Sequence, residues 1–245
     1  MSRVGADRVG NIAALVAVIV VNFMSNAVPL GGQTTSEISA NYPALFTPAG
    51  FTFGIWGLIY LSLGVFVVYQ ALPSQQDNHT VARISLWFKL SCFFNAAWIF
   101  AWHYEFLIVS LIFMLGILWS LIKIFRVVDL ESGFVLRFPF SLYTGWVTVA
   151  TIANLSAVQL AYGFDEAGLT AIQWTWLKLA LAGAVGAIVL SRTSNAIYVA
   201  VIAWSAFGIF SKQSATPEVA GAAITVSLLS LLLVANAIVL DRSRR

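Results

Sequence analysis

Apolar residues form long runs along this chain, and short polar segments separate the runs. The runs cover roughly residues 10–28, 50–72, 85–103, 106–125, 139–162, 172–190, 195–210 and 219–240. A run of about 20 apolar residues is long enough to cross the hydrocarbon core of a bilayer as a helix. The pattern therefore predicts an all-α integral membrane protein with about eight spans, of which the seventh is short for a crossing.

The composition agrees with a membrane protein. Hydrophobic residues make up 60% of the chain and charged residues only 9%, against about 25% in ordinary domains. The mean hydropathy is +0.89. Eight spans joined by short loops leave no room for a sizeable soluble domain. The net charge of +3 fits the charge asymmetry of membrane loops, and we expect no nucleic-acid partner.

Basic residues fall mainly on one side of the predicted spans. With the N-terminus inside, eleven of the thirteen Lys and Arg residues lie inside, Lys212 lies outside and Lys178 lies within a span. Positive charge in short loops marks the cytoplasmic side. We therefore expect both termini in the cytoplasm of a multi-pass protein of a plasma membrane, such as a bacterial inner membrane. The inner basic residues are Arg3, Arg8, Arg83, Lys89, Lys123, Arg126, Arg137, Arg192, Arg242, Arg244 and Arg245.

The N-terminal run has two interpretations. Arg3 and Arg8 precede it, and Ser25-Asn26-Ala27 resembles a signal-peptidase site, so the run fits a cleaved signal peptide. Asn11, Asn22 and Asn26 fit a retained helix whose amides face a helix bundle. We favour the retained helix.

Three of the predicted helices carry aromatic, small and amide side chains along one face, at steps of three and four. Asparagine is costly at membrane depth unless its amide finds a partner, so these faces turn toward protein or a ligand. Together they predict an apolar pocket with a few polar groups, as in small-molecule sites. The residues are Phe53, Trp56, Tyr60 and Gly64 in the second run, Asn95, Trp98 and Trp102 in the third, and Tyr143, Trp146, Ala150 and Asn154 in the fifth.

The same residue types also have a purely structural interpretation. Asparagines often serve only as hydrogen-bonding groups between helices, and Trp is enriched where helices meet the bilayer interface. Five tryptophans near predicted span ends fit such an interfacial belt. They are Trp87, Trp102, Trp119, Trp174 and Trp176.

Three motifs lie on these helices in order: Pro43-x4-Pro48-x7-Trp56-Gly57-x2-Tyr60-x3-Gly64, then Asn95-x2-Trp98, then Tyr143-x2-Trp146-x3-Ala150-x3-Asn154. Together they resemble the first loop, second helix, third helix and fifth helix of the tryptophan-rich sensory protein family, TspO. This family includes the translocator protein once called the peripheral benzodiazepine receptor. The resemblance covers about residues 10–162.

The resemblance implies a five-helix bundle at 1–162 that binds porphyrins or other hydrophobic ligands near its first loop. Residues 163–245 would then be an extension of three helices without a counterpart in the five-helix family. By position, the resemblance implies a ligand site with a covering loop and a porphyrin or haem as its ligand; the residues themselves name no cofactor. The implied lining residues are Trp56, Tyr60, Asn95, Trp98, Tyr143, Trp146, Ala150 and Asn154, and the covering residues are Pro43, Phe46 and Pro48.

The chain departs from the family pattern mainly in this covering loop. Thr47-Pro48 stands where the family has paired prolines, and Leu45 and Gly50 replace two expected tryptophans. Leu142 replaces the proline that begins the fifth-helix motif. These changes fall around the expected site and bear on ligand specificity.

Signals for metal binding and catalysis are poor. His79 and His103 lie at opposite sides of the membrane, and neither has a Cys or carboxylate at metal-ligand spacing. His103 and Glu105 fit a polar rim or an axial contact to a haem-like ligand, but we favour a plain interfacial histidine. No nucleophile triad or phosphate-binding loop is present in the sequence. We predict no catalytic residues and no metal site.

Lys178 is the exceptional charge, about two turns inside the sixth run. A charge at this depth marks a functional candidate, but lysine also reaches the headgroups by snorkelling. Nearby, Ala182-x3-Gly186 and Gly183-x3-Ala187 are pairs suited to close helix packing or to a homodimer. The sequence therefore favours a receptor or sensor for a hydrophobic planar ligand. The alternatives are a small-solute transporter that uses Lys178 and the buried asparagines, and an enzyme acting on porphyrin or lipid.

Overall fold

The computed structural model describes residues 4–131, 133–164 and 168–243, and these residues contain helices and loops but no strand. Side chains are described for 7–128, 133–164 and 168–239. The long helices are α1 (Val4–Ala27), α3 (Ile55–Ala71), α4 (His79–His103), α5 (Leu107–Glu131), α6 (Phe134–Ala161), α7 (Ala171–Thr193), α8 (Ala196–Lys212) and α9 (Pro217–Ser243). Short helical segments are η1 (Leu30–Gly32), α2 (Thr35–Asn41), η2 (Gly50–Gly54) and η3 (Pro73–Gln75).

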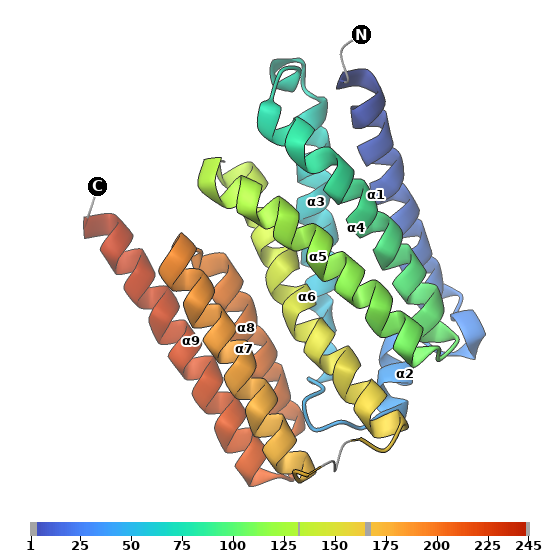
Figure 1. Ribbon diagram of the computed structural model, residues 1–245, viewed down its shortest axis with the longest axis vertical. Coiled ribbons are helices and arrows are strands. Elements are labelled where there is room, and N and C mark those ends of the chain that lie inside the picture. The colour runs from blue at the N-terminus through green and yellow to red at the C-terminus, as the bar shows by residue number, and fades with distance from the viewer. Residues whose placement is uncertain (1–3, 132, 165–167, 244–245) are drawn as a thin grey trace.

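Each of the eight apolar runs forms a helix, and successive long helices alternate in direction (Figure 1). The first and last helices therefore begin and end on the same side, as the loop charges predict. Most predicted bounds lie within a few residues of the observed ones. The exceptions are the starts of α1 and α4 and the end of α5, each six residues beyond the predicted run. α4 begins at His79 because the Asn78 side chain caps it by accepting the backbone N–H of Val81 at 3.2 Å.

Six of the described helical segments are long and apolar enough to cross a membrane: Asp7–Ala27, Gly50–Ala71, His79–His103, Leu107–Val128, Ala171–Thr193 and Pro217–Val239. The protein is therefore an integral multi-pass membrane protein. α8 is also apolar but has only 17 residues, in agreement with the short seventh run.

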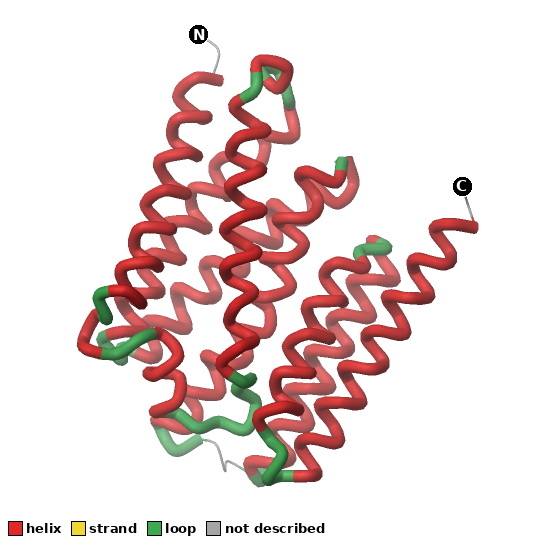
Figure 2. The backbone as a smooth tube through the Cα atoms, turned by 180° about the vertical axis from the view of Figure 1, so that it is seen from behind, coloured by secondary structure: helices red, strands yellow, loops and turns green. Residues whose placement is uncertain are grey.

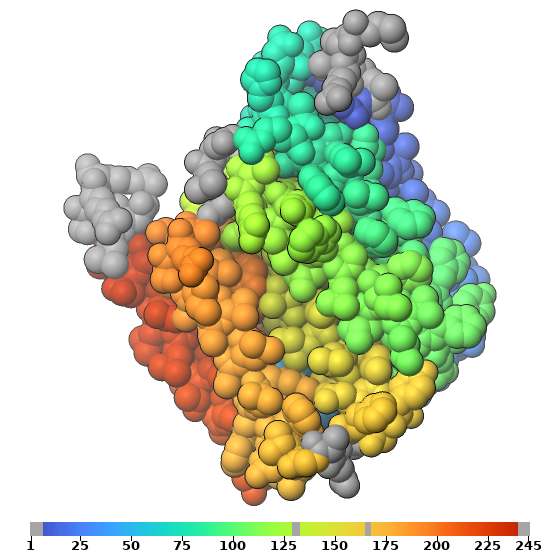
Figure 3. Space-filling view, viewed as in Figure 1, coloured from blue at the N-terminus to red at the C-terminus, as the bar shows by residue number. Residues whose placement is uncertain are grey.

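α6 is the remaining long helix, and it lies at the centre of the molecule. More than half of its 28 residues are buried, including Tyr143, Trp146 and Asn154. In Figure 3 it is recessed between α5 and α7 at mid-height. A helix covered by protein needs no continuous lipid-facing surface, so it can carry polar residues at membrane depth.

Two hydrophobic cores organise the molecule. The first core contains residues of α1, α3, α4, α5 and α6. Within it, Phe66, Phe88 and Phe140 are in mutual edge-to-face contact at ring-centroid distances of 5.0–6.1 Å. The second joins α7, α8 and α9, and also contains residues of the first loop, α5 and α6. Because α6 contributes to both cores, the two parts of the chain pack against each other. The domain boundary near residue 162 stays a prediction from the sequence.

α8 docks directly on α6. The Asn195 amide donates a hydrogen bond to Ser141 Oγ at 2.7 Å, and Tyr198 Oη donates to Thr148 Oγ1 at 2.8 Å. A Cβ atom at Gly145 would lie only 3.1 Å from the carbonyl oxygen of Tyr198, so this glycine permits the close approach of the two helices.

The small residues of α7 pack within the chain. A Cβ atom at Gly186 would lie 3.4 Å from Ile202 of α8, and one at Gly183 would lie 3.5 Å from Val226 of α9. Ala182 is also buried. These positions therefore serve contacts between α7 and its two neighbours, and they do not form a free dimerisation face.

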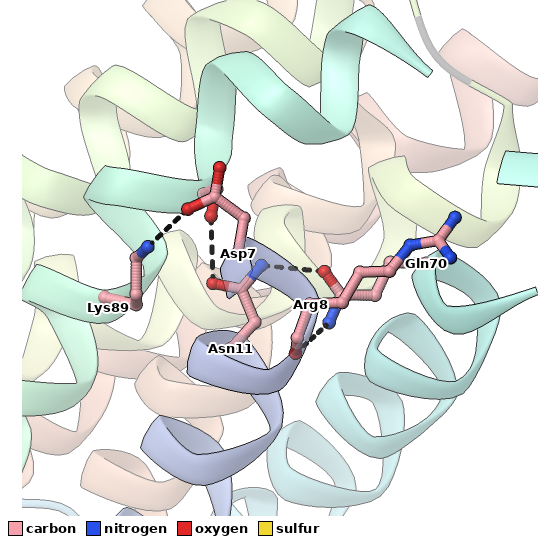
Figure 4. Close-up of polar contacts among 6 residues, drawn as sticks. Asp7, Arg8, Asn11, Gln70 and Lys89 are labelled. Carbon is pink, nitrogen blue, oxygen red and sulfur yellow. Dashed lines mark hydrogen bonds and ion pairs between the residues drawn. The ribbon is translucent and has the colours of Figure 1, made fainter. Parts of the chain in front are cut away.

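A polar network joins α1, α3 and α4 near the N-terminal end (Figure 4). Asn11 donates to Gln70 Oε1 at 2.7 Å and accepts from Ser85 Oγ at 3.1 Å. Beside it, Lys89 pairs with Asp7 at 2.7 Å. Asn11 and Gln70 have no exposed surface. The prediction that Asn11 faces the inside of a bundle is confirmed, and this packing favours a retained first helix.

Candidate ligand-binding site

An aromatic cluster lies between α3, α4 and α6, with Trp56 at its centre. The Trp56 ring contacts Tyr60, Trp98, Tyr143 and Trp146, at centroid distances of 5.5, 6.4, 5.8 and 6.2 Å. Tyr60 and Trp98 stack on it nearly in parallel, whereas Tyr143 and Trp146 present edges. The structure thus brings together the rings predicted to converge from three helices.

Two further rings extend the cluster. Trp102 stacks on Trp98 one helical turn away, at a centroid distance of 5.9 Å, and Phe53 lies edge-on to Trp146 at 5.7 Å. Trp102 is only 5% exposed, and its indole N–H donates to the carbonyl of Thr35 at 3.2 Å. The assignment of Trp102 to an interfacial belt was therefore wrong, because its spacing from Trp98 places it on the buried face of α4.

A small, partly open cavity lies against this cluster. Its volume is about 40 Å³. That volume accommodates water, which needs roughly 10–15 Å³, but is far below the ~300 Å³ of a small-molecule pocket. Its lining includes Trp56, Trp98, Trp146, Ala150, Asn154 and Pro48 from the predicted set, together with Thr35, Ser39, Thr47, Phe53, Trp102, Met114, Val149, Ala153 and Ala157.

A larger open groove lies on the other side of Trp56, between α1 and α3. Its volume is about 630 Å³, which falls in the range of small-molecule sites. Cavity and groove share Thr35, Phe53, Trp56 and Trp98, so these side chains form the wall between them. The remaining lining residues are Ile19, Asn22, Phe23, Asn26, Ala27, Ser36, Gly50, Gly57 and Tyr60.

The α1 side of this groove was missed by reasoning from the sequence. Asn22 and Asn26 were identified as bundle-facing residues but were not assigned to the site. Their spacing of four residues places both on one side of α1, and this was the available signal.

Asn95 connects three helices. Its Oδ1 accepts a hydrogen bond from the Asn22 amide at 2.8 Å, and its Nδ2 donates to Tyr143 Oη at 2.8 Å. Asn95 has no exposed surface. Its amide is therefore used within the bundle, between α1, α4 and α6, and neither Asn95 nor Tyr143 lines the cavity or the groove.

Asn154 makes a second connection of the same kind. Its Oδ1 accepts the indole N–H of Trp98 at 3.0 Å, and its Nδ2 donates to Ser110 Oγ at 3.0 Å. It is 3% exposed and lies on the cavity wall. Asn154 thus joins α4, α5 and α6 and fixes the orientation of the Trp98 ring.

Two aromatic side chains of the cluster have buried polar atoms without a hydrogen-bond partner in the described part of the chain. They are the indole nitrogen of Trp146, on the cavity wall, and the hydroxyl of Tyr60, on the groove wall. A buried unpaired donor costs about 1–3 kcal/mol. Each is a point at which a water molecule or a polar ligand group would be stabilised.

His103 and Glu105 do not form a common rim. His103 is 4% exposed, with its Nδ1 atom 2.8 Å from the carbonyl oxygen of Ile99 and its Nε2 atom 3.4 Å from Thr35 Oγ1. Glu105 instead accepts a hydrogen bond from Tyr42 Oη at 2.5 Å. Burial and the adjacent Glu105 carboxylate raise the pKa of Tyr42 to about 12. Within the described ranges, no three His, Cys, Asp or Glu side chains gather in a metal-binding arrangement.

The three predicted covering residues have different positions. Pro48 is buried and lines the cavity. Pro43 is exposed. Phe46 is 1% exposed, but its ring packs in the second core, with α7 to α9. Of the three residues, Pro48 alone lines the cavity, and Phe46 belongs to the second core.

Lys178 lies apart from the aromatic cluster. It is partly buried on α7, which packs against α8 and α9, and it lines neither the cavity nor the groove. Asn22, Asn95 and Asn154 instead make hydrogen bonds among α1, α4, α5 and α6. These residues therefore do not share one lining surface.

Comparison with known proteins identifies the family. No curated protein and no solved structure matches this chain. A family profile described as "TSPO-like protein" matches residues 8–237. The match extends beyond the motifs at 10–162 and includes α7, α8 and nearly all of α9. The chain, with its helical membrane fold and its convergent tryptophans, thus belongs to the TSPO-like protein family.

Proposed function

We propose that this protein is a membrane receptor or sensor that binds a hydrophobic planar ligand, of the porphyrin or other tetrapyrrole type, in the groove between α1 and α3. The observation that carries the proposal is the position of Trp56. Its ring forms the wall of a groove of about 630 Å³ and is supported from behind by Trp98 and Trp146. The tetrapyrrole class comes from the family resemblance.

The groove offers an apolar platform with polar positions at one end. Phe53, Trp56 and Tyr60 supply ring surfaces, while Asn26 and Ser36 are exposed lining residues. A planar ligand would pack against the Phe53, Trp56 and Tyr60 side chains that line the groove and direct its polar groups toward the exposed residues. Stacking of aromatic rings contributes about 0.5–1.5 kcal/mol beyond the burial of area.

The small cavity would have a different role. At about 40 Å³ it accepts no planar macrocycle without movement of its walls. A shift of the Trp56 ring would join it to the groove, because both spaces share that wall. The unpartnered Trp146 nitrogen would then become accessible to a polar atom of the ligand.

Titration with protoporphyrin IX, followed by quenching of tryptophan fluorescence, tests the proposal on the purified chain in nanodiscs. Trp56→Ala removes the stacking surface and should weaken binding roughly 2- to 13-fold. Trp119→Ala is the matched control, since Trp119 is 57% exposed on α5 and lines neither space. Equal affinities of the two variants would contradict the proposed site.

Solute transport remains the alternative prediction. Uptake into vesicles that is abolished by Lys178→Met, while porphyrin affinity is unchanged, would favour it. A homodimer and a bacterial inner membrane are also predictions, to be checked by mass measurement in nanodiscs and by fractionation.

A further inference from the structure

The segment between Leu45 and Phe53 is docked on α8 along most of its length. Gln213 donates its side-chain N–H to the carbonyl of Leu45 at 3.0 Å. The backbone N–H of Ala49 donates to the carbonyl of Gly208 at 3.0 Å, and Trp204 donates its indole N–H to the carbonyl of Thr52 at 3.1 Å. In Figures 1 and 2 this segment crosses the lower end of the molecule, between the α1–α6 group and α7–α9.

Apolar contacts reinforce these three hydrogen bonds. Phe46 is buried in the second core, beside residues such as Leu179 and Ile209. Phe51 lies edge-on to Trp204 at a ring-centroid distance of 5.5 Å. The segment is therefore held both at its beginning and near its end.

The fit between Thr52 and Gly208 is especially close. A Cβ atom at Gly208 would lie 2.1 Å from Thr52 Oγ1, 2.9 Å from its Cγ2 and 3.0 Å from its Cβ. Thr52 is fully buried, and its hydroxyl has no hydrogen-bond partner in the described chain. Packing against the bare Gly208 backbone thus fixes the position of Thr52.

The same segment forms part of both binding spaces. Thr47, Pro48 and Phe53 line the small cavity, and Gly50 and Phe53 line the groove. Residues that touch α8 therefore alternate with residues that face the site. A displacement of the segment relative to α8 would move these lining residues with it.

We propose that Trp204 and Gly208 of α8, with Gln213 directly after this helix, are positioning residues that hold the 45–53 segment in place over the cavity and at the wall of the ligand groove. This inference rests on the function proposed above, and it assigns the positioning of the 45–53 segment to the C-terminal helices α7 to α9. The segment opens by leaving α8, which exposes the cavity and moves Gly50 and Phe53 of the groove wall, so its opening weakens the hold on the ligand. The affinity and residence time of the ligand therefore depend on a helix that does not line the site.

A cysteine at the cavity wall tests the inference without any ligand. Thr47 is 5% exposed, so a Thr47→Cys thiol reacts with a water-soluble maleimide only when the segment opens. The native Cys92 is buried on α4, and labelling of the unsubstituted protein gives the background. Rates are measured on the full chain in nanodiscs.

Gly208→Ala is the main perturbation. Overpacking of the Thr52 contact should accelerate labelling of Thr47→Cys roughly 5- to 150-fold. Thr52→Ala in the same chain should slow the labelling in part, because it removes the contacts at 2.1 and 2.9 Å and leaves the tight one at 3.0 Å. Gly221→Ala is the matched control, since a Cβ atom on this α9 glycine meets nothing within 4 Å.

Gln213→Ala is the milder variant and carries the test if Gly208→Ala does not fold. Loss of its hydrogen bond should accelerate labelling roughly 2- to 12-fold. Dissociation of protoporphyrin IX should accelerate in the same order of variants. A purely structural role would instead lower the melting temperature and leave labelling slow.

Labelling of folded Gly208→Ala or Gln213→Ala at the parental rate would overturn the inference, and so would equal acceleration by Gly221→Ala. Faster labelling in a protein that binds no porphyrin would support positioning by α8 and contradict the ligand proposed above. The two proposals thus fail by different measurements.

Discussion

Replacement of Asn154 by alanine gives the most direct test of how the cluster is held. Asn154 accepts the indole N–H of Trp98 at 3.0 Å and donates to Ser110 at 3.0 Å, while its side chain is almost completely buried. Ser110 keeps a partner after the substitution, because its hydroxyl also donates to the carbonyl of Leu107 at 2.7 Å. The Trp98 N–H loses its acceptor.

The expected loss follows from these partners. A buried donor left unpaired costs about 1–3 kcal/mol. A hydrogen bond between helices in a membrane contributes about 0.6 kcal/mol on average and up to about 1.7. The free energy of unfolding of Asn154→Ala should therefore fall by about 1.5–4 kcal/mol.

Unfolding by sodium dodecyl sulfate from mixed micelles measures this loss. Asn26→Ala is the matched control, since Asn26 is exposed and donates only to Asn22 and Ser25 within its own helix. It should change the free energy by less than about 0.5 kcal/mol. A double-mutant cycle with Trp98→Phe adds a second criterion: removing donor and acceptor together should cost less than the sum of the single losses. Equal losses for Asn154→Ala and Asn26→Ala, or strict additivity in the cycle, would refute the assigned hydrogen bond.

Three further substitutions test other parts of the structure. Burial and Glu105 raise the pKa of Tyr42 from 10.0 to about 12, so the stability that this phenol contributes is complete below pH 10 and is lost as the pH rises toward 12. Glu105→Gln should lower that pKa. An unchanged absorbance titration of the tyrosinate would contradict the Tyr42–Glu105 interaction. Gln70→Ala leaves the Asn11 amide without its 2.7 Å acceptor and should lower the free energy of unfolding by about 1–3 kcal/mol, whereas an unchanged melting temperature would show that the network in Figure 4 adds nothing. Lys178→Met should leave the dissociation constant for protoporphyrin IX within about twofold, since Lys178 lines neither space, and a tenfold change would move the site.

The number, order and approximate bounds of the long helices were predictable from the sequence. The length of an apolar run and the spacing of residues along one face are local properties that each helix expresses by itself. The steps between Asn95, Trp98 and Trp102, and between Tyr143 and Trp146, place these residues on inward faces for the same reason. Family motifs then indicate which faces converge.

The partners of these residues were not predictable in the same way. That Asn95 bonds to Asn22 and Tyr143 depends on the distance and rotation between three helices, which no single helix specifies. The family resemblance predicts Phe46 as a covering residue, but its side chain belongs to the second core. The size of the cavity is likewise set by side-chain packing across several elements.

The central position of α6 has a consequence for how the protein is made. Several of its hydroxyls are already satisfied within the helix, since Thr144, Thr148 and Thr151 each donate to the carbonyl four residues earlier. Tyr143 and Asn154 instead need groups on α4 and α5, which leave the ribosome first. The helix that would enter lipid least readily by itself therefore emerges when its partners are present, and its insertion should depend on them.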